Sequence, residues 1–355
     1  MDRPDDTRPP VAAEPDWLAT PVRDELVLRT VPGAVDYLAD SLTQLGGGVQ
    51  ATIVGRLRDG VRVAYHGPLR ALAADRYFSS CAVVLAETTT EPGVDLITPP
   101  APGGVLAALA ADGEVTFRVG DLGRHRFAIR DTVRDTLAWR NDPRDWAVNL
   151  VWDGSLVLAE IGALHTTRRF GRLERLPAST TPVISAVLTR LLKAEPQHVV
   201  LDPFCGSGTN LLHVYAMSGV AVILGTDRDR GALRAAAENL RRARAPRHLA
   251  MADATALPFA DGSVDRIVAN LPFGKRVGSH QRNEELYPAF LRELARVMAT
   301  KARAVLLTED KRLLRTWVRR VSGLRPVKEV GLESGGAHPS AFVLTNRPST
   351  GRRAR

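Results

Sequence analysis

Three short motifs in the second half of the chain carry residue types that could do chemistry together. In chain order they are DPFCGSGT (202–209), GTDRD (225–229) and NLPFG (270–274). Each motif by itself is compatible with an ordinary turn. Their order and spacing predict something more specific, namely a glycine-rich cofactor loop, an acidic strand end and a clamp for a planar amine.

The first two motifs and a later aspartate predict a pocket for S-adenosylmethionine. Gly206 and Gly208 allow a sharp turn, and the helix that follows can offer unpaired N–H groups to the carboxylate of this cofactor. Asp227, at the end of the next predicted strand, can accept both ribose hydroxyls, and Asp253 can accept the adenine amine. A dinucleotide is the competing cofactor, but the third glycine of GxGxxG and a Walker sequence are both absent.

The third motif predicts that the methyl acceptor is an exocyclic amine on a base. Asn270 offers an amide oxygen, and Pro272 holds out the carbonyl of Leu271 as a second acceptor. Phe273 can stack on the ring that carries the amine. Since asparagine has no useful pKa, we expect catalysis by positioning and by stabilisation of the nitrogen as it becomes positive. A simple strand-ending turn is the alternative interpretation of this motif.

Composition predicts a globular chain with a polyanionic partner. The 355 residues correspond to two or three domains, and 48 Lys+Arg against 39 Asp+Glu give a net charge of +9, which favours nucleic acid as a partner. An arginine-rich, lysine-poor chain can also reflect genomic base composition. Cys81 and Cys205 are isolated, so neither a disulfide nor a metal site is predicted. Without a signal peptide or a membrane-spanning stretch, the sequence predicts a cytoplasmic protein.

The first half of the chain predicts an α+β region. From residue 17 to about residue 87 the pattern follows the order β-α-β-β-α-β, which is typical of a ferredoxin-like unit. Beyond it we expect a helix at 103–113, strands at 115–121 and 125–131, a helix at 134–141 and a hairpin around Asp153-Gly154.

The second half predicts a different architecture. After a helix at 182–194, short apolar strands alternate with amphipathic helices from residue 198 to about residue 310. Such alternation predicts a mostly parallel, doubly wound sheet, with a ligand at the carboxyl ends of its strands. All three motifs fall at predicted strand ends.

The run from DPFCGSGT through GTDRDRGALRAAAEN, DATALPFADGSVDRIVANLPFG and ELYPAFLRELARVM resembles the THUMP-containing RNA methyltransferases that methylate the N2 amine of guanosine in tRNA. The resemblance covers most of residues 165–310, and TVPGAVDYLADSL (30–42) is similar to the start of that family's ferredoxin-like unit. It implies an α/β chain, with a C-terminal Rossmann-like class I methyltransferase domain and an N-terminal α+β ferredoxin-like/THUMP-like region. Composition and patterning along the chain predict a disordered leader (1–16), the N-terminal region (17–165), a connector (166–182), the methyltransferase domain (183–346) and a basic tail (347–355).

By this resemblance, residues 270–273 hold the target guanine, and a guanosine at position six of the tRNA acceptor stem is the favoured target. The chain departs from many relatives at His213, where they carry an acidic residue. The implied cofactor pocket consists of Asp202, Pro203, Phe204, Gly206, Gly208, Thr209, Asp227, Arg228, Asp253, Ala254 and Asn270.

Several cations could contact RNA phosphates. They are Arg168, Arg169 and Arg172 in the connector, Lys275 and Arg276 beside the clamp, and Arg312, Arg315 and Arg319 along one predicted helix face. A base within a stem would have to flip out to reach Asn270. The alternatives left open are methylation of guanine N2 in ribosomal RNA, methylation of adenine N6, or RNA binding without catalysis. The oligomeric state is also open, and a monomer is favoured.

Overall fold

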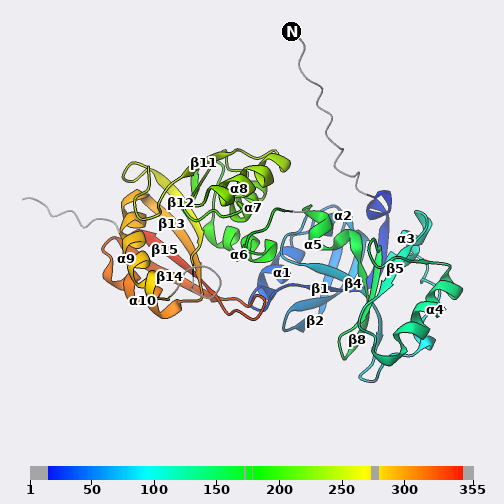
Figure 1. The fold of residues 1–355 in the computed structure, drawn as a ribbon. Helices are drawn as coiled ribbons and strands as arrows, with labels where there is room; N and C mark the ends of the chain where they lie inside the picture. Colours follow the sequence, from blue (N-terminus) through cyan, green and yellow to red (C-terminus); the bar gives the residue numbers. More distant parts are fainter. Residues whose placement is uncertain (1–14, 172, 178, 273–279, 347–355) are drawn as a thin grey trace, which may run out of the picture.

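The computed structural model describes residues 15–171, 173–177, 179–272 and 280–346. Within these ranges the chain forms an N-terminal sheet of eight strands and a C-terminal sheet of seven strands. The two sheets and their helices lie side by side along the molecule (Figure 1). The predicted fold class, an α+β region followed by a Rossmann-like α/β sheet, is therefore confirmed.

The N-terminal region begins with the predicted order β-α-β-β-α-β. Its strand register brings apolar residues opposite each other: Leu26 pairs with Val63 and Leu28 with Val61, and all four are fully buried. The strands are β1 (Pro21–Arg29), β2 (Gln50–Leu57), β3 (Gly60–Pro68), β4 (Ser80–Glu87), β5 (Thr116–Val119), β6 (Arg140–Asn141), β7 (Val148–Trp152) and β8 (Leu156–Ile161). The helices are η1 (Asp16–Ala19), α1 (Val35–Leu42), α2 (Arg70–Ala73), η2 (Val94–Leu96), α3 (Val105–Ala111), η3 (Gly123–His125), α4 (Arg126–Leu137), η4 (Gly162–Leu164) and α5 (Thr166–Arg169).

One continuous sheet joins the two parts that the sequence suggested for this region. Its strand order is β2-β3-β1-β4-β8-β7-β5-β6. The join is the antiparallel pairing of β4 with β8, in which Ala82 lies opposite Glu160. The predicted hairpin around Asp153-Gly154 is confirmed as β7 and β8.

The strand predicted at 125–131 is wrong, because this segment is the first part of helix α4. Ile129 and Val133 are buried one helical turn apart, whereas Phe127 is 57% exposed. Over seven residues the large apolar side chains of Phe127 and Ile129, two positions apart, look like a strand, and the helical period becomes visible only when Val133 is included. The helix predicted at 134–141 is also displaced, since α4 ends at Leu137 and Arg140–Asn141 forms β6.

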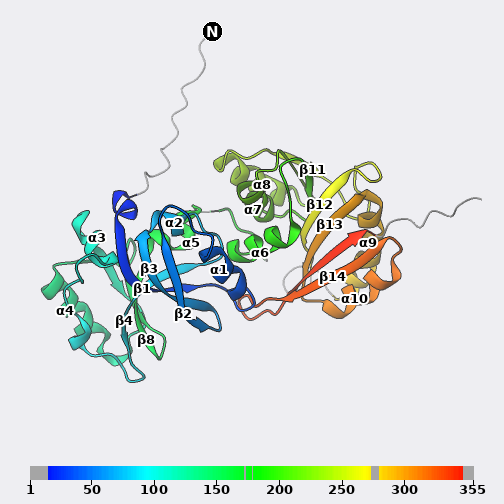
Figure 2. The same ribbon diagram turned by 180° about the vertical axis from the view of Figure 1, so that it is seen from behind.

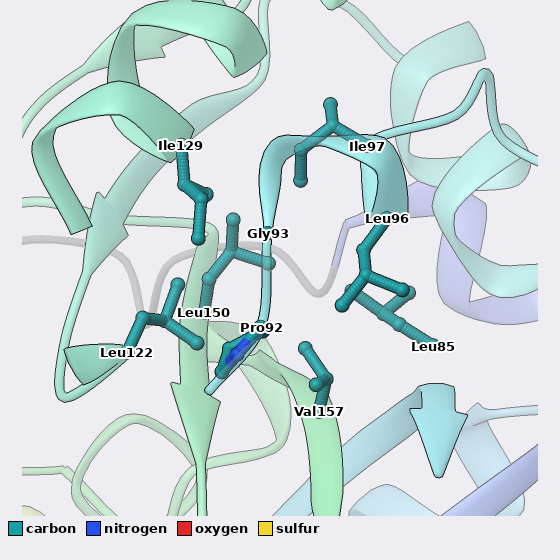
Figure 3. Close-up of a pocket in the computed structure, with 9 residues that line it drawn as sticks. All are labelled: Leu85, Pro92, Gly93, Leu96, Ile97, Leu122, Ile129, Leu150 and Val157. Carbon is teal, nitrogen blue, oxygen red and sulfur yellow. The ribbon is translucent and has the colours of Figure 1, made fainter. Parts of the chain in front are cut away.

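Figure 3 shows where α4 packs on the N-terminal sheet. Ile129 points toward Leu122, Leu150 and Val157, around a cavity of only about 10 Å³ that is lined by apolar side chains. A space of this size holds at most one water molecule, and polar partners for that water are lacking in its lining. We therefore interpret it as imperfect core packing and not as a ligand site.

The C-terminal sheet has the strand order β11-β10-β9-β12-β13-β15-β14. Strands β11, β10, β9, β12 and β13 are parallel, which confirms the predicted doubly wound sheet, and β15 pairs antiparallel with both β13 and β14. The strands are β9 (Val199–Asp202), β10 (Val222–Asp227), β11 (His248–Met251), β12 (Val264–Asn270), β13 (Met298–Thr308), β14 (Leu324–Gly331) and β15 (Ser340–Asn346). The helices are α6 (Pro182–Leu192), α7 (Thr209–Ser218), α8 (Arg230–Arg242), α9 (His280–Val297) and α10 (Lys311–Arg320).

Helices cover both faces of this sheet (Figure 1). Val268 of β12 packs in the same cluster as Leu188 of α6 and Leu211 of α7. Its neighbour Ile267 belongs to the opposite cluster, with Phe290 of α9. Both faces of β12 are therefore apolar, as expected for a central parallel strand.

The loop between β14 and β15 joins the C-terminal sheet to the N-terminal region (Figure 2). The backbone N–H of Glu333 donates to the carbonyl of Pro32 at 3.1 Å, and the Glu333 carboxylate pairs with Arg58 at 2.6 Å. Because Ser340 lies opposite Thr308 at the end of β13, this loop lies at the edge of the sheet where the parallel strands end. None of the helices in the described part of the chain is long and apolar enough to cross a membrane.

Candidate functional site

The glycine loop connects the end of β9 to the start of α7. Gly206 and Gly208 have φ values of +52° and +78°, a region that residues with a side chain rarely adopt. A Cβ atom on Gly208 would also lie 3.2 Å from the Cβ atom of Ala236 in α8. The loop can therefore turn this tightly only because glycine occupies both positions.

Asp227, at the end of β10, binds the glycine loop. Its Oδ2 atom accepts the backbone N–H of Gly206 at 2.9 Å, and its Oδ1 atom accepts the N–H of Asp229 at 2.9 Å. Each carboxylate oxygen can accept more than one hydrogen bond. The half-buried carboxylate therefore still has acceptor capacity for two hydroxyl donors, which is the chemistry that the sequence predicted for it.

Asp202, at the end of β9, is fully buried and organises the start of the loop from inside. It accepts the N–H of Phe204 and the side-chain amide of Asn210, each at 3.0 Å. Asn210 in turn accepts the hydroxyl of Ser185 from α6 at 2.8 Å. Burial raises the pKa of Asp202 to about 7. A cation bound near this carboxyl group would lower that pKa again, because it favours the ionised form.

The remaining predicted pocket residues surround the same strand ends. Met251 of β11 lies opposite Asp227, which places Asp253 two residues beyond the end of the parallel ladder. Asp253 is exposed and accepts the N–H and hydroxyl of Thr255, and these bonds lower its pKa. Pro203, Thr209 and Ala254 are buried, Phe204 packs edge-on against Phe290, and Arg228 is exposed.

The clamp motif begins at the end of β12, beside β9. Asn270 lies opposite Leu307 of β13, and the N–H of the next residue, Leu271, donates to the Leu307 carbonyl at 2.9 Å. Because β12 is parallel to β9, Asn270 and Asp202 come to the same edge of the sheet. Phe273 and Gly274 lie outside the described residues, as do Lys275 and Arg276.

Asn239 of α8 is a site residue that the sequence analysis missed. Its fully buried amide donates to the Ser207 carbonyl at 2.8 Å and to the Glu174 carbonyl at 2.9 Å, and its oxygen accepts the Glu174 N–H at 2.8 Å. It thus connects the cofactor loop to the chain segment that enters the C-terminal half. An asparagine on the buried helix face of Ala232 and Ala236 was the signal that could have revealed it.

His213 of α7 packs beside Phe170. It is buried, its Nδ1 atom lies 3.0 Å from the Thr209 carbonyl, and its ring meets Phe170 edge-on at 6.0 Å. Burial lowers its pKa to about 4, so the side chain is neutral at physiological pH. The Arg76 guanidinium also lies over the Phe170 ring, at 4.5 Å, and its charge further disfavours protonation of His213.

Arg169 occupies a different environment from the one that the sequence suggested. Its guanidinium donates to the carbonyl oxygens of Asp75 and Phe78 and stacks over the rings of Phe78 and Phe170, at 3.8 and 4.8 Å. Burial lowers its pKa to about 10. The phosphate contact predicted for Arg169 is therefore replaced by a structural role at the junction between the two halves.

The other predicted RNA-contacting residues are less constrained. Arg168 is exposed, pairs with Asp145 at 3.0 Å and lies over the Trp146 ring. Arg315 pairs with Glu329 at 2.7 Å, on a helix face that also carries Arg312 and Arg319. Arg172 lies outside the described residues.

A cavity of about 540 Å³ opens between the two halves. It is lined by Thr30–Pro32 and Arg58–Asp59 of the N-terminal region, by Thr181, and by residues 333–338 of the β14–β15 loop. Among the described residues, no group of three or more His, Cys, Asp or Glu side chains is placed to hold a metal ion.

Comparison with known proteins agrees with this site. Residues 169–340 match a family model described as an RMKL-like methyltransferase domain. The chain is 37% identical over 234 residues to the tRNA (guanine(6)-N2)-methyltransferase of Thermus thermophilus, with 65% of this chain and 67% of that protein covered. It is 30% identical over 254 residues to the Bos taurus tRNA (guanine(6)-N(2))-methyltransferase THUMP3, with 63% of this chain and 48% of that protein covered.

The chain thus spans about half the length of the mammalian relatives that it matches. Among solved structures, the crystal structure of TrmN from Thermus thermophilus aligns with a TM-score of 0.72 at 26% identity and covers 91% of this chain and 99% of that one. Both the fold and the sequence therefore place the protein with enzymes that transfer a methyl group. The chain belongs to the family of class I S-adenosylmethionine-dependent methyltransferases.

Proposed function

We propose that the protein methylates the exocyclic N2 amine of a guanosine in tRNA, with position six of the acceptor stem as the favoured target. The observation that carries this proposal is the meeting of the glycine loop, Asp227 and Asn270 at one edge of the parallel sheet. A cofactor pocket and an amine clamp are thereby adjacent. The names of the Thermus and mammalian relatives support the choice of base and of RNA.

The pocket residues have separable roles in this proposal. S-adenosylmethionine supplies an electrophilic methyl group when it is bound. Asp227 accepts the two ribose hydroxyls, Asp253 accepts the adenine amine, and the N–H groups at the start of α7 bind the carboxylate. Phe204 and Ala254 line the pocket, and Asp202 maintains the loop that leads into α7.

The clamp residues position the attacking nitrogen. The amide oxygen of Asn270 and the carbonyl of Leu271 accept the two hydrogens of the amine, which directs its lone pair toward the methyl group. Bound S-adenosylmethionine would supply the methyl group, and the two oxygen acceptors would stabilise the nitrogen as it becomes positive. Its proton then leaves to solvent, so no side chain has to act as a strong base.

The N-terminal region provides features suited to RNA. Phe127 on α4 is 57% exposed, and the guanidinium groups of Arg126 and Arg130 lie 4.6 and 5.4 Å from its ring centre. An exposed ring flanked by cations can stack on a base while the cations meet phosphates. We propose residues 17–165 as a THUMP-like RNA-binding region, 166–182 as the connector and 183–346 as the catalytic domain of a cytoplasmic enzyme that acts as a monomer.

Transfer of labelled methyl groups to unmodified tRNA tests this function. We expect N2-methylguanosine from the wild type and at least about a hundredfold slower transfer by Asn270→Ala, since the amine would lose one of its two acceptors. Asn346→Ala is the matched control, because Asn346 also ends a strand but at the opposite edge, where it donates to the Ala299 carbonyl.

Other products would contradict the proposed substrate or the proposed activity. Label in N6-methyladenosine, or transfer to ribosomal RNA alone, would replace the proposed substrate. Cofactor binding without transfer to either RNA would indicate a non-catalytic RNA-binding protein. An Asn270→Ala variant as active as Asn346→Ala would remove Asn270 from the mechanism.

A further inference from the structure

We propose that Tyr287 and Thr308 are positioning residues of the amine clamp, because their hydroxyls form a relay that holds the Pro272 carbonyl. This inference rests on the proposed function, in which Asn270 and Leu271 receive the amine. It concerns how their geometry is maintained. Thr308 lies outside the sequence motifs described above, and Tyr287 lies in the segment ELYPAFLRELARVM, in which no residue was assigned a role.

The relay consists of short hydrogen bonds among buried groups. Tyr287 of α9 is fully buried, and its hydroxyl donates to the Pro272 carbonyl at 2.8 Å. The same hydroxyl lies 2.8 Å from the Thr308 hydroxyl at the end of β13, and Thr308 is also fully buried. The Thr308 oxygen accepts the backbone N–H of Asp310 at 2.9 Å.

The direction of each bond follows from the chemistry of its partners. A carbonyl can only accept, so the single Tyr287 proton is committed to Pro272. The Thr308 hydroxyl must then donate to the Tyr287 oxygen. The chain of donation runs from the Asp310 N–H through Thr308 and Tyr287 to the Pro272 carbonyl. Each group in it thus has one orientation, which a lone hydroxyl would not have.

The relay acts on the clamp by fixing the backbone on one side of Leu271. On the other side, the N–H of Leu271 is already bound to the Leu307 carbonyl at 2.9 Å. The Leu271 carbonyl lies between these two anchors, and the proline ring restricts the torsion that follows it. The Tyr287 hydroxyl therefore fixes the residue that follows Leu271, and with it the direction in which the Leu271 carbonyl meets the amine.

The Tyr287 hydroxyl is not needed to fill the core. The ring packs in a cluster with Phe290 and Leu291, where a phenylalanine ring would occupy nearly the same volume. Within the described residues, this hydroxyl bonds to Pro272, which follows β12, and to Thr308, which ends the neighbouring strand β13. Burial raises the pKa of Tyr287 above its ordinary value, so the hydroxyl remains a proton donor at neutral pH.

Tyr287→Phe tests the relay, and the chain offers a matched control. Tyr65 is also buried and also donates its hydroxyl to a proline carbonyl, that of Pro68 at 2.7 Å, but it lies in the N-terminal sheet. Tyr287→Phe should lower kcat for tRNA methylation about tenfold or more and leave the Kd for S-adenosylmethionine within about twofold, because only the acceptor geometry changes. Tyr65→Phe should destabilise the protein comparably while its kcat stays within about twofold of the wild type.

Substitutions of Thr308 provide a rescue test. Thr308→Val removes the hydroxyl at nearly constant volume and should resemble Tyr287→Phe, whereas Thr308→Ser retains the hydroxyl and should keep most of the wild-type kcat. A Tyr287→Phe variant with wild-type kcat, or a serine variant no better than the valine variant, would overturn the relay.

Hydrogen exchange separates this inference from the proposed function. In the protein without RNA, the Leu271 amide should exchange about tenfold faster in Tyr287→Phe and Thr308→Val than in Tyr65→Phe and Thr308→Ser, because one anchor of the clamp backbone is lost. Equal exchange in all four variants would overturn the relay even if the wild type methylates tRNA. Faster exchange combined with an inactive wild type would support the relay and reject the proposed reaction.

Discussion

The backbone N–H of Gly206 donates to the Oδ2 atom of Asp227 at 2.9 Å. This bond connects the turn after β9 to the acidic end of β10, so the loop and the carboxylate form one unit before any ligand arrives. A carboxylate held in this way needs little reorganisation to bind a ribose.

Replacing Asp227 by Asn should weaken cofactor binding. An amide retains one oxygen, so it cannot both hold the loop and accept two ribose hydroxyls. We expect the Kd for S-adenosylmethionine to rise about 10- to 100-fold, as for loss of one or two charge-assisted hydrogen bonds. Calorimetry without RNA measures this change. Asp229→Asn is the control, because asparagine remains a good helix N-cap there; a Kd shifted equally in both variants would contradict the assignment.

Replacing Asn239 by Ala should loosen the cofactor loop. The change leaves the Ser207 carbonyl and both backbone groups of Glu174 without their partner, which should cost about 2–4 kcal/mol of unfolding free energy. We also expect cofactor affinity to fall, whereas Glu238→Ala on the exposed side of the same helix should leave that affinity unchanged. Denaturant titration and calorimetry measure the two effects. Loss of stability with unaltered cofactor affinity would show that the loop does not depend on Asn239.

His213 should make the protein sensitive to mild acid. Its pKa of about 4 in the folded state lies below the ordinary value of 6.5, so the unfolded chain binds more protons between these values. Stability is therefore complete above pH 6.5 and is lost as the pH falls toward 4, by about 2 kcal/mol at pH 5.

Denaturant titrations at pH 7.5 and pH 5 measure this contribution. His213→Gln should remove most of that difference, whereas His248→Gln, at an exposed position on β11, should retain it. An acid sensitivity that is the same in His213→Gln and in the wild type would assign the effect to other groups.

Substitution of Arg169 should lower the stability of the protein, whereas substitution of Phe127 should weaken its binding to RNA. Arg169→Met leaves the carbonyls of Asp75 and Phe78 unpaired and should cost about 2 kcal/mol or more of unfolding free energy, without changing how tRNA affinity depends on salt. Phe127→Ala should weaken tRNA binding by about 1–3 kcal/mol, since a base would lose its stacking partner, with little effect on stability.

Denaturation and filter binding over a range of salt concentrations distinguish the two residues. The double variant should show both effects additively. If the tRNA affinity of Arg169→Met depended less on salt than that of the wild type, Arg169 would be an RNA contact after all. Unchanged tRNA binding by Phe127→Ala would show that Phe127 on α4 does not contact RNA.

The sequence indicated most of the C-terminal half because its information is local. Parallel strands that are covered on both faces are short apolar runs, as at 199–202, and the amphipathic helices between them have the period of 3.6 residues. The strand pair β14–β15 was not predicted. Five consecutive residues of β14 are exposed, including Val327, so the strand lacks the apolar alternation that periodicity detects.

By itself the sequence determined the order of the chemical groups: a glycine turn, an acidic strand end and an asparagine clamp, each at the end of a strand. Tertiary structure alone decided which groups meet. Asn239 reaches the glycine loop, Tyr287 reaches Pro272, and the predicted RNA contact Arg169 is taken into the junction with Phe78. The physical reason is that periodicity reports which face of an element is apolar, whereas hydrogen-bond partners depend on how distant elements pack, and this packing has no local signature.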